Sequence, residues 1–234
     1  MIEKNGYLKT AGIGILAILI YFILPMLEAV PLQLLGIDTT TLPLLAKIIY
    51  MIAYETIILI LILLTFYPKL KRDFMDMKKN HMNYYSKYFK YWLFGLFIMM
   101  MSNFLIMKFT DNQIASNEQA VQSLFEISPI YIFFSAVIFA PFVEELVFRQ
   151  GIRNIIPNKL LFIIASGLVF GGLHVISSNM KSLSELLYLI PYCTPGIIFA
   201  YILAQTDNIF VSIGLHFMHN GLLIALQFFL LFFS

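Results

Sequence analysis

The stretch Pro141-Phe-Val-Glu-Glu-Leu-Val-Phe-Arg-Gln150 places two adjacent carboxylates and an arginine at the end of an apolar run. That run, residues 130–143, is long enough to lie inside a bilayer, where one charged side chain costs about 2.5–3.5 kcal/mol at the centre of a helix. On a helix Glu145 and Arg149 lie four residues apart with the acid first, the favourable order for an ion pair. Glu144 points about 100° away from Glu145 and has no partner on its own helix. One carboxylate is therefore free for chemistry.

The composition of the whole chain is typical of a membrane protein. Of its 234 residues 60% are hydrophobic and 12% are charged, with a mean hydropathy of +0.86, whereas soluble domains are roughly 45–50% apolar and 25% charged. We therefore expect an all-α fold, a polytopic membrane bundle of about seven transmembrane helices, with six to eight as the limits. The net charge of +2 gives no indication of nucleic-acid binding. The single cysteine, Cys193, excludes an intrachain disulfide.

Charge patterning predicts the orientation and a division into two parts. Residues 68–90 are strongly basic, and the positive-inside rule places this expected loop in the cytoplasm. Residues 110–128 contain acids but no Lys or Arg, which predicts an outer loop. We assign residues 1–128 to N-terminal transmembrane helices and residues 129–230 to a C-terminal helical core. We expect a multi-pass protein of the cell membrane, by composition a bacterial plasma membrane, with a cytoplasmic N-terminus.

Small residues and prolines indicate how two of the later helices pack. Gly167 and Gly171 are four residues apart and form a small face that allows close helix approach. Pro191 and Pro195 lie in the next helix and predict a kink or a break there.

Polar groups at membrane depth recur on two further helices of the C-terminal half. Phe170 and His174 share one helix face at i, i+4, and His216 and Asn220 do the same on the last helix. His219, three residues from His216, is expected to be structural. Each residue alone is explained about as well by packing as by function. The set is more informative, because its members follow in order on separate helices.

These residue types supply the groups that peptide hydrolysis needs, namely a base for water and donors for an oxyanion. Glu144 can act as the base. His174 can hold the same water or shuttle its proton. His216 and Asn220 can donate to the developing oxyanion. The ion pair that follows Glu144 would orient its carboxylate.

The order of these residues resembles the motifs of the CPBP family, the CAAX proteases and bacteriocin-processing enzymes also known as Abi. The motifs stand here as Glu144-Glu145-x-x-x-Arg149, Phe170-x-x-x-His174 and His216-x-x-x-Asn220. The resemblance covers about residues 129–225. It implies the all-helical core of the Ras-converting CAAX endopeptidase, in which the first glutamate and the middle histidine activate water. The last histidine and asparagine would then form the oxyanion site, in agreement with the roles assigned above.

The leading hypothesis is a hydrolase, an intramembrane endopeptidase that cuts a peptide or lipid-anchored protein near the cytoplasmic face of the bilayer. In a bacterium, a bacteriocin or pheromone precursor is favoured over a prenylated protein. The alternative is a non-catalytic immunity or regulatory scaffold protein of the same family. A proton-coupled transporter ranks lower, because the chain lacks repeated halves. No cofactor and no metal are expected. Zinc held by a glutamate and two histidines is the less favoured option, since no His-Glu-x-x-His helix is present.

Overall fold

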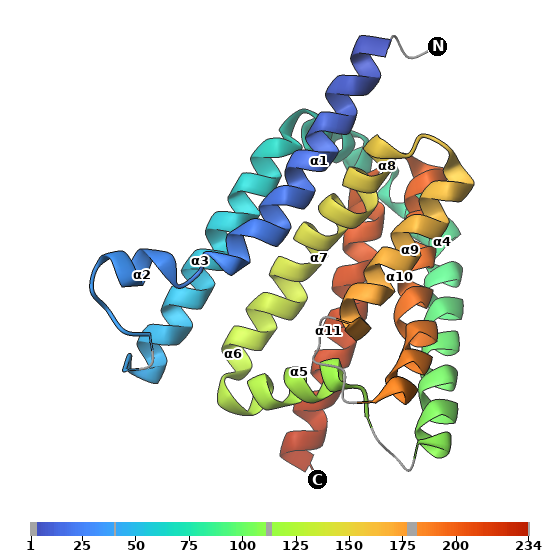
Figure 1. Cartoon of the computed structure of the whole chain (residues 1–234). Coiled ribbons are helices and arrows are strands. Elements are labelled where there is room, and N and C mark those ends of the chain that lie inside the picture. The colour runs from blue at the N-terminus through green and yellow to red at the C-terminus, as the bar shows by residue number, and fades with distance from the viewer. Residues whose placement is uncertain (1–3, 40, 111–113, 177–181, 234) are drawn as a thin grey trace.

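The computed structural model describes residues 4–39, 41–110, 114–176 and 182–233, and every regular element in these ranges is a helix. Seven spans in the described residues are long and apolar enough to cross a membrane. They are Gly6–Met26, Leu44–Thr65, Tyr67–Phe109, Pro129–Ile155, Lys159–Ile176, Leu183–Thr206 and Ile209–Leu230. The prediction of an all-α membrane bundle with about seven spans is confirmed (Figure 1).

Two N-terminal helices, α1 (Lys4–Met26) and α3 (Leu44–Thr65), form one side of the bundle and are joined through the short helix α2 (Val30–Leu34) (Figure 1). α1 also packs closely on the helix that carries the central motif. A Cβ added at Gly14 would collide with the carbonyl oxygen of Gly151. The absence of a side chain at Gly14 therefore lets two backbones touch, and α1 supports the central helix directly.

The basic segment 68–90 is helical, which corrects our expectation of a loop. It is the first half of α4 (Tyr67–Phe109), a helix of 43 residues. The prediction was wrong because we took the polar composition as a sign of a loop. The segment can form a helix, since it contains no glycine and its single proline, Pro68, lies in the first turn, where its missing amide costs nothing. An ion pair between residues four apart adds support, since Lys69 Nζ lies 2.8 Å from Oδ2 of the buried Asp73. Figure 1 shows this half crossing the N-terminal end of the bundle and the second half running down its edge.

The expected outer loop 110–128 is also largely helical, although residues 111–113 lie outside the described residues. It contains α5 (Ser116–Ile127), which crosses the end of the bundle opposite the N-terminus (Figure 1). α5 buries Phe125, whose ring packs edge-on against Phe228 at 4.7 Å between centroids. This amphipathic helix was missed because its few buried residues are separated by polar ones, which we took as a sign of a loop.

The central motif lies in a continuous helical run that contains two π-helical stretches. In order the segments are α6 (Pro129–Ile132), η1 (Phe133–Phe139), α7 (Ala140–Glu144), η2 (Glu145–Gly151) and α8 (Ile152–Ile155). η1 and η2 each span seven residues in which backbone amides pair with carbonyls five residues earlier. π-helical turns are rare and occur frequently at functional sites. The run therefore has special geometry on both sides of Glu144.

The next two helices, α9 (Lys159–Ile176) and α10 (Leu189–Thr206), pack closely through small residues. A Cβ added at Gly196 would lie 3.0 Å from the Cα of Gly167, and one added at Gly171 would collide with Cys193. The predicted close approach at Gly167 and Gly171 is confirmed.

The prolines of α10 do not break it. α10 follows η3 (Leu183–Tyr188), a short 3₁₀ helix, and continues through Pro195 to its end. Pro191 is the third residue of α10, where no earlier helical carbonyl needs its amide. The expected break is therefore not found in these described residues.

The last helix, α11 (Ile209–Phe233), begins at a turn anchored on α4. The carboxylate of Asp73 accepts the backbone amide of Ile209 at 3.0 Å, and Asn208 Nδ2 donates to the backbone carbonyl of Asp73 at 2.8 Å. Asp73 is 2% exposed. A buried carboxylate from one helix thus caps the N-terminus of another, where the helix dipole favours negative charge.

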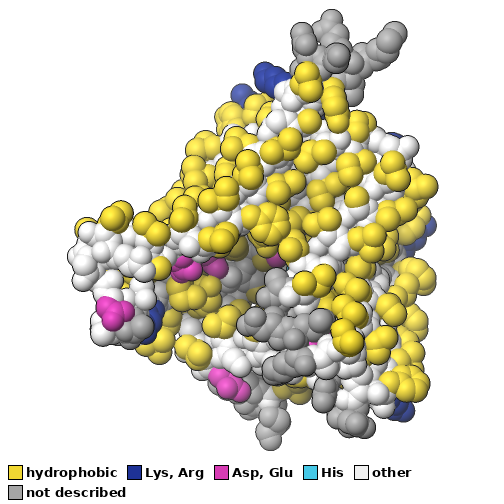
Figure 2. Space-filling model, viewed as in Figure 1, with side chains coloured by type: hydrophobic (Ala, Val, Ile, Leu, Met, Phe, Trp, Pro, Cys, Tyr) yellow, Lys and Arg dark blue, Asp and Glu magenta, His cyan; other side chains and the backbone are white. Residues whose placement is uncertain are grey.

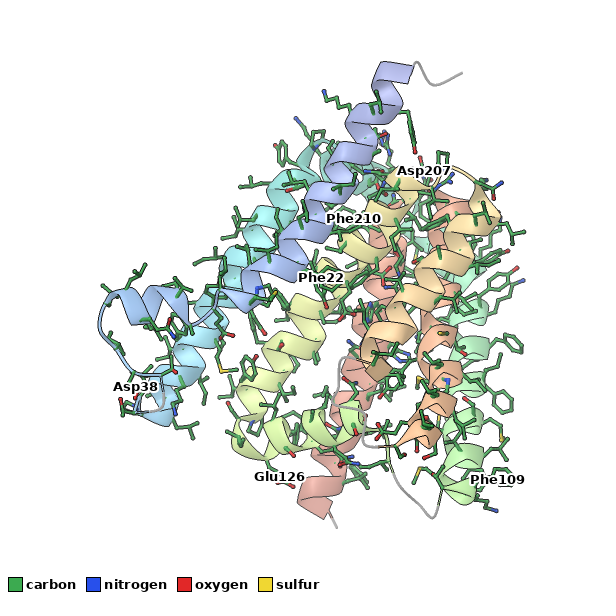
Figure 3. All side chains as sticks on the ribbon, in the orientation of Figure 1. Phe22, Asp38, Phe109, Glu126, Asp207 and Phe210 are labelled. Carbon is green, nitrogen blue, oxygen red and sulfur yellow. The ribbon has the colours of Figure 1, made fainter. Side chains whose placement is uncertain are left out.

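The two ends of the bundle differ in charge. Seven Lys and Arg residues lie in the basic half of α4, which crosses the end of the bundle at which the N-terminus lies (Figure 1). Asp207, in the turn before α11, lies at that same end, whereas Phe109 and Glu126 lie at the other (Figure 3). This asymmetry is the pattern that the positive-inside rule describes.

Candidate active site

The residues singled out in the sequence lie on three neighbouring helical runs. Glu144, Glu145 and Arg149 belong to the central run, Phe170 and His174 to α9, and His216 and Asn220 to α11. The two carboxylates differ in access, because the Glu144 side chain is 14% exposed and that of Glu145 is completely buried. Figure 2 shows a hollow in the face between α3 and α9 with acidic side chains inside it. Glu144 is therefore the carboxylate that water can reach.

His216 lies between the two glutamates. Its Nδ1 is 2.9 Å from Oε1 of Glu145, and its Nε2 is 3.8 Å from Oε2 of Glu144. Because the Glu145 oxygen also faces the guanidinium of Arg149 at 3.3 Å, it is an acceptor, and His216 Nδ1–H donates to it. This bond fixes the imidazole and directs Nε2 at Glu144.

The charges of this cluster require one extra proton for neutrality. Glu144 and Glu145 carry two negative charges against the single positive charge of Arg149, and His216 faces both acids. An uncompensated charge is costly at this burial. One proton held by Glu144 or by His216 Nε2 balances the cluster.

Aromatic rings enclose the cation of this cluster. The guanidinium carbon of Arg149 lies 4.0 Å from the ring centroid of Phe170 and 5.7 Å from that of Phe199. Phe199 also stacks on His216, with 5.1 Å between centroids and 25° between planes. These contacts provide cation–π attraction in place of water. Phe170 thus supports the position of Arg149, which in turn holds Glu145.

His174 is oriented by its own helix. Its Nδ1 is 2.9 Å from the carbonyl oxygen of Phe170, and since a carbonyl can only accept, Nδ1 carries the proton. Nε2 is then a bare acceptor. The ring stacks on Tyr192 of α10 at 5.3 Å and contacts the Phe170 ring at 4.3 Å. The Phe170 ring also lies 6.1 Å from His216, so it connects the two histidines.

Asn220 holds a backbone carbonyl that the π-helix leaves unpaired. The amide of Ala140 donates to the carbonyl of Ser135, five residues earlier. The next residue in that register is Pro141, which has no amide hydrogen to offer Ala136. Asn220 Nδ2 donates to the Ala136 oxygen at 2.7 Å. One hydrogen of the Asn220 amide is therefore engaged and orients the group, while the other stays available.

Sequence reasoning missed two aromatic partners of the site. Phe199 and Tyr192 stack on His216 and His174 and lie seven residues apart on α10, two helical turns on one face. That spacing was visible in the sequence, but it looks like ordinary packing.

The geometry separates His219 from the cluster. Its ring meets Trp92 and Phe199 edge-on, with centroids 6.5 and 6.3 Å away, and His219 is buried. We expected a structural role for it, and these contacts are those of a packed side chain. Among the described residues no group of three or more His, Cys, Asp or Glu side chains is placed to share one metal ion.

Comparison with known proteins identifies the half of the chain that carries this site. Residues 126–222 match the family described as Type II CAAX prenyl endopeptidase Rce1-like. The chain is 29% identical over 116 residues to YdiL of Bacillus subtilis, named as a membrane peptidase, an alignment that covers 48% of this chain and 43% of YdiL. No solved structure matches the chain.

A second relative extends the similarity to nearly the whole chain. The membrane-embedded CAAX protease MroQ of Staphylococcus aureus is 27% identical over 230 residues, covering 92% of this chain and 88% of MroQ. The similarity therefore includes the N-terminal helices, which carry no motif. The three motifs in order, the helical fold and both relatives agree that this chain is similar to membrane proteases of the Rce1-like CAAX endopeptidase type.

Proposed function

We propose that the protein is an intramembrane endopeptidase in which Glu144 activates the attacking water. The observation that carries the proposal is the arrangement of His216 between two carboxylates. Glu145 fixes its Nδ1 at 2.9 Å, so that Nε2 and the partly exposed Glu144 carboxylate face each other at 3.8 Å. This separation exceeds a hydrogen bond, so both groups can bind a reacting molecule.

In the proposed reaction each polar group has one task. Glu144 removes a proton from water, and the resulting hydroxide attacks the peptide carbonyl carbon. The bare Nε2 of His174 accepts a hydrogen bond from the same water. Protonated His216 and the second amide hydrogen of Asn220 donate to the oxyanion. When the tetrahedral intermediate collapses, the C–N bond breaks and Glu144 returns its proton to the leaving amine.

The substrate class follows from the membrane setting. A base at membrane depth favours a peptide or membrane-anchored protein that reaches the site from within or beside the bilayer. The name of the relative MroQ refers to CAAX substrates. Because both named relatives are bacterial, we propose a precursor of a secreted peptide, such as a bacteriocin or a pheromone, as the substrate. The reaction as proposed uses no metal or cofactor.

We further propose that the basic end of the bundle faces the cytoplasm, as the positive-inside rule predicts. The N-terminus and the turn at Asp207 lie at this end (Figure 3). A reporter active only in the cytoplasm should therefore work when it is inserted after Asp207. It should fail after Glu126, which lies at the opposite end. The reverse pattern would contradict the proposed orientation.

The test of activity measures the peptides in the membranes and the culture medium of a deletion strain and compares them among complemented versions of that strain. The strain is complemented with wild type, Glu144→Gln or Glu126→Gln at equal membrane abundance. Glu126→Gln is the matched control, because it makes the same chemical change at the far end of the bundle. We expect uncut precursors to accumulate with Glu144→Gln only. Loss of an activated base lowers rates by roughly 10²–10⁴-fold.

Two outcomes would contradict the proposal. Wild-type cleavage by Glu144→Gln would remove Glu144 as the base. Rescue of the cellular phenotype by Glu144→Gln without any cleavage would show that the scaffold role is the operative one.

A further inference from the structure

A polar pocket lies outside the candidate active site, on the surface between the basic half of α4 and the end of α10. Its volume is about 350 Å³. Its lining includes Asn83 and Lys87 from α4 and Gln205 from α10. Asp207, two residues after Gln205, lies at the same end of the bundle as the N-terminus (Figure 3). The pocket therefore belongs to the basic end, where we place the cytoplasmic membrane surface.

Three polar side chains at this pocket keep their donors free. Among the described residues, Asn83, Lys87 and Gln205 make no side-chain hydrogen bond. The ammonium group of Lys87 contacts only the ring of Tyr88, 5.4 Å from its centroid. Two amide groups and one cation, all from exposed residues, thus line one cavity without an acceptor among the described side chains.

The acid that two of the lining residues contact, Asp76, is already occupied. Asn80 and Tyr84, which also line the pocket, donate to Asp76 at 2.6 and 2.7 Å, and Asn208 donates to the same carboxylate at 2.7 Å. Asp76 lies behind these donors and is not itself part of the lining. The lining therefore has one positive charge and no negative charge.

From this arrangement we propose that the pocket binds the phosphate headgroup of an anionic phospholipid. A phosphate diester offers acceptor oxygens to all three free donors and a negative charge to Lys87. The volume of the pocket, about 350 Å³, suits a lipid headgroup. Further lysines on the same half of α4 lie next to aromatic rings, as Lys78 does to Phe74 and Lys90 to Tyr91. Such pairs of basic and aromatic side chains are typical of the membrane interface, where lipid headgroups are present at high concentration.

The site is distinct from the proposed protease centre, and its occupancy has a structural consequence. Asn208 joins the pocket wall to the turn that begins α11, because it donates both to Asp76 and to the backbone of Asp73. A bound headgroup would connect α4 to α10 across this turn. The lipid would therefore stabilise the end of the bundle from which α11 extends to His216.

The experiment measures lipid binding to the full-length protein in detergent by native mass spectrometry. Phosphatidylglycerol is compared with phosphatidylcholine for wild type, Lys87→Gln, Asn83→Ala/Gln205→Ala and Lys71→Gln. Lys71→Gln is the control, because Lys71 is exposed on the same helix outside the pocket. We expect wild type to prefer phosphatidylglycerol, Lys87→Gln to bind it about fivefold more weakly, and Lys71→Gln to bind as wild type does. The neutral double variant should also bind more weakly, which a diffuse charge effect does not predict.

Three results would overturn the proposal. Equal weakening by Lys71→Gln and Lys87→Gln would reduce the effect to general surface charge. Displacement of the lipid by millimolar inorganic phosphate, with no preference between lipid classes, would assign the pocket to a soluble phosphate group. Tighter binding of an acidic peptide than of phosphatidylglycerol would identify a protein partner instead.

Discussion

At the scale of single residues, the site is organised by the buried pair of Glu145 and Arg149. Both side chains have no exposed surface. Arg149 pairs with the carboxylate of Glu145 and lies against two aromatic rings. Glu145 also accepts a hydrogen bond from His216. Burying such a pair gains little net stability, whereas removing one partner leaves a bare charge in the core. We therefore regard the pair as a device that fixes His216.

Arg149→Met should destabilise the protein by about 3–5 kcal/mol, because it leaves the Glu145 charge buried and unpaired. Arg153→Met is the matched control one turn further along the run, where the side chain is partly exposed. It should cost less than about 1 kcal/mol. Thermal unfolding in detergent measures both. The double variant Glu145→Gln/Arg149→Met should recover part of the loss. Equal effects of the two single arginine variants would refute this assignment.

At the scale of elements, the π-helical stretch η1 explains why an asparagine on α11 matters to a distant helix. Pro141 removes the amide that would pair with the Ala136 carbonyl, and Asn220 supplies the replacement at 2.7 Å. Glu55 of α3 holds the same stretch from another side, since it accepts hydrogen bonds from Ser135 and Tyr131 at 2.9 Å each. η1 is thus held between α3 and α11.

A double-mutant cycle between Pro141 and Asn220 tests this relation without a substrate. Asn220→Ala alone should cost about 1–2 kcal/mol, because it removes the donor from the half-buried Ala136 carbonyl. In the Pro141→Ala background a backbone amide can pair with that carbonyl, so the same change should cost under about 0.5 kcal/mol. Thermal unfolding of the four proteins gives the coupling.

A control double-mutant cycle combines Asn220→Ala with Pro25→Ala, since Pro25 lies inside α1. Pro25→Ala and Asn220→Ala should be additive. Additivity within about 0.5 kcal/mol in the Pro141 cycle as well would show that the proline does not create the unpaired carbonyl.

At the scale of the whole molecule, the basic half of α4 holds the start of α11, the helix that carries His216. Asp73 accepts the first amide of α11 and the ammonium group of Lys69 at 2.8 Å. His216 follows Ile209 by two helical turns on the same helix. The cap therefore sets where α11 begins and contributes to the depth at which its polar residues lie.

Asp73→Asn should loosen the start of α11, since it weakens charge-assisted bonds worth about 1.5–3 kcal/mol. Hydrogen exchange of the peptide 206–215, followed by mass spectrometry, should become faster. Asp207→Asn is the control, because its side chain is 80% exposed and pairs only with Lys69 and Arg72 at 3.6–3.7 Å. An unchanged exchange rate in Asp73→Asn would contradict the capping role.

Much of this protein followed from its sequence. Apolar runs of bilayer length predict seven membrane helices, because in lipid every backbone polar group must be paired within its own segment. Motif spacing placed the candidate residues on three helical runs, because helical periodicity fixes which residues share a face. The close packing at Gly167 was likewise predictable, since a missing side chain is a local property.

Tertiary structure alone decided the rest. Whether the polar segments 68–90 and 110–128 form loops or helices depended on what they pack against, and composition does not reveal that. The bond from Asn220 to Ala136 and the choice of Glu145 as partner of His216 join residues far apart in the chain. Such contacts depend on helix rotation and depth, which the packing of the whole bundle determines and no local pattern encodes.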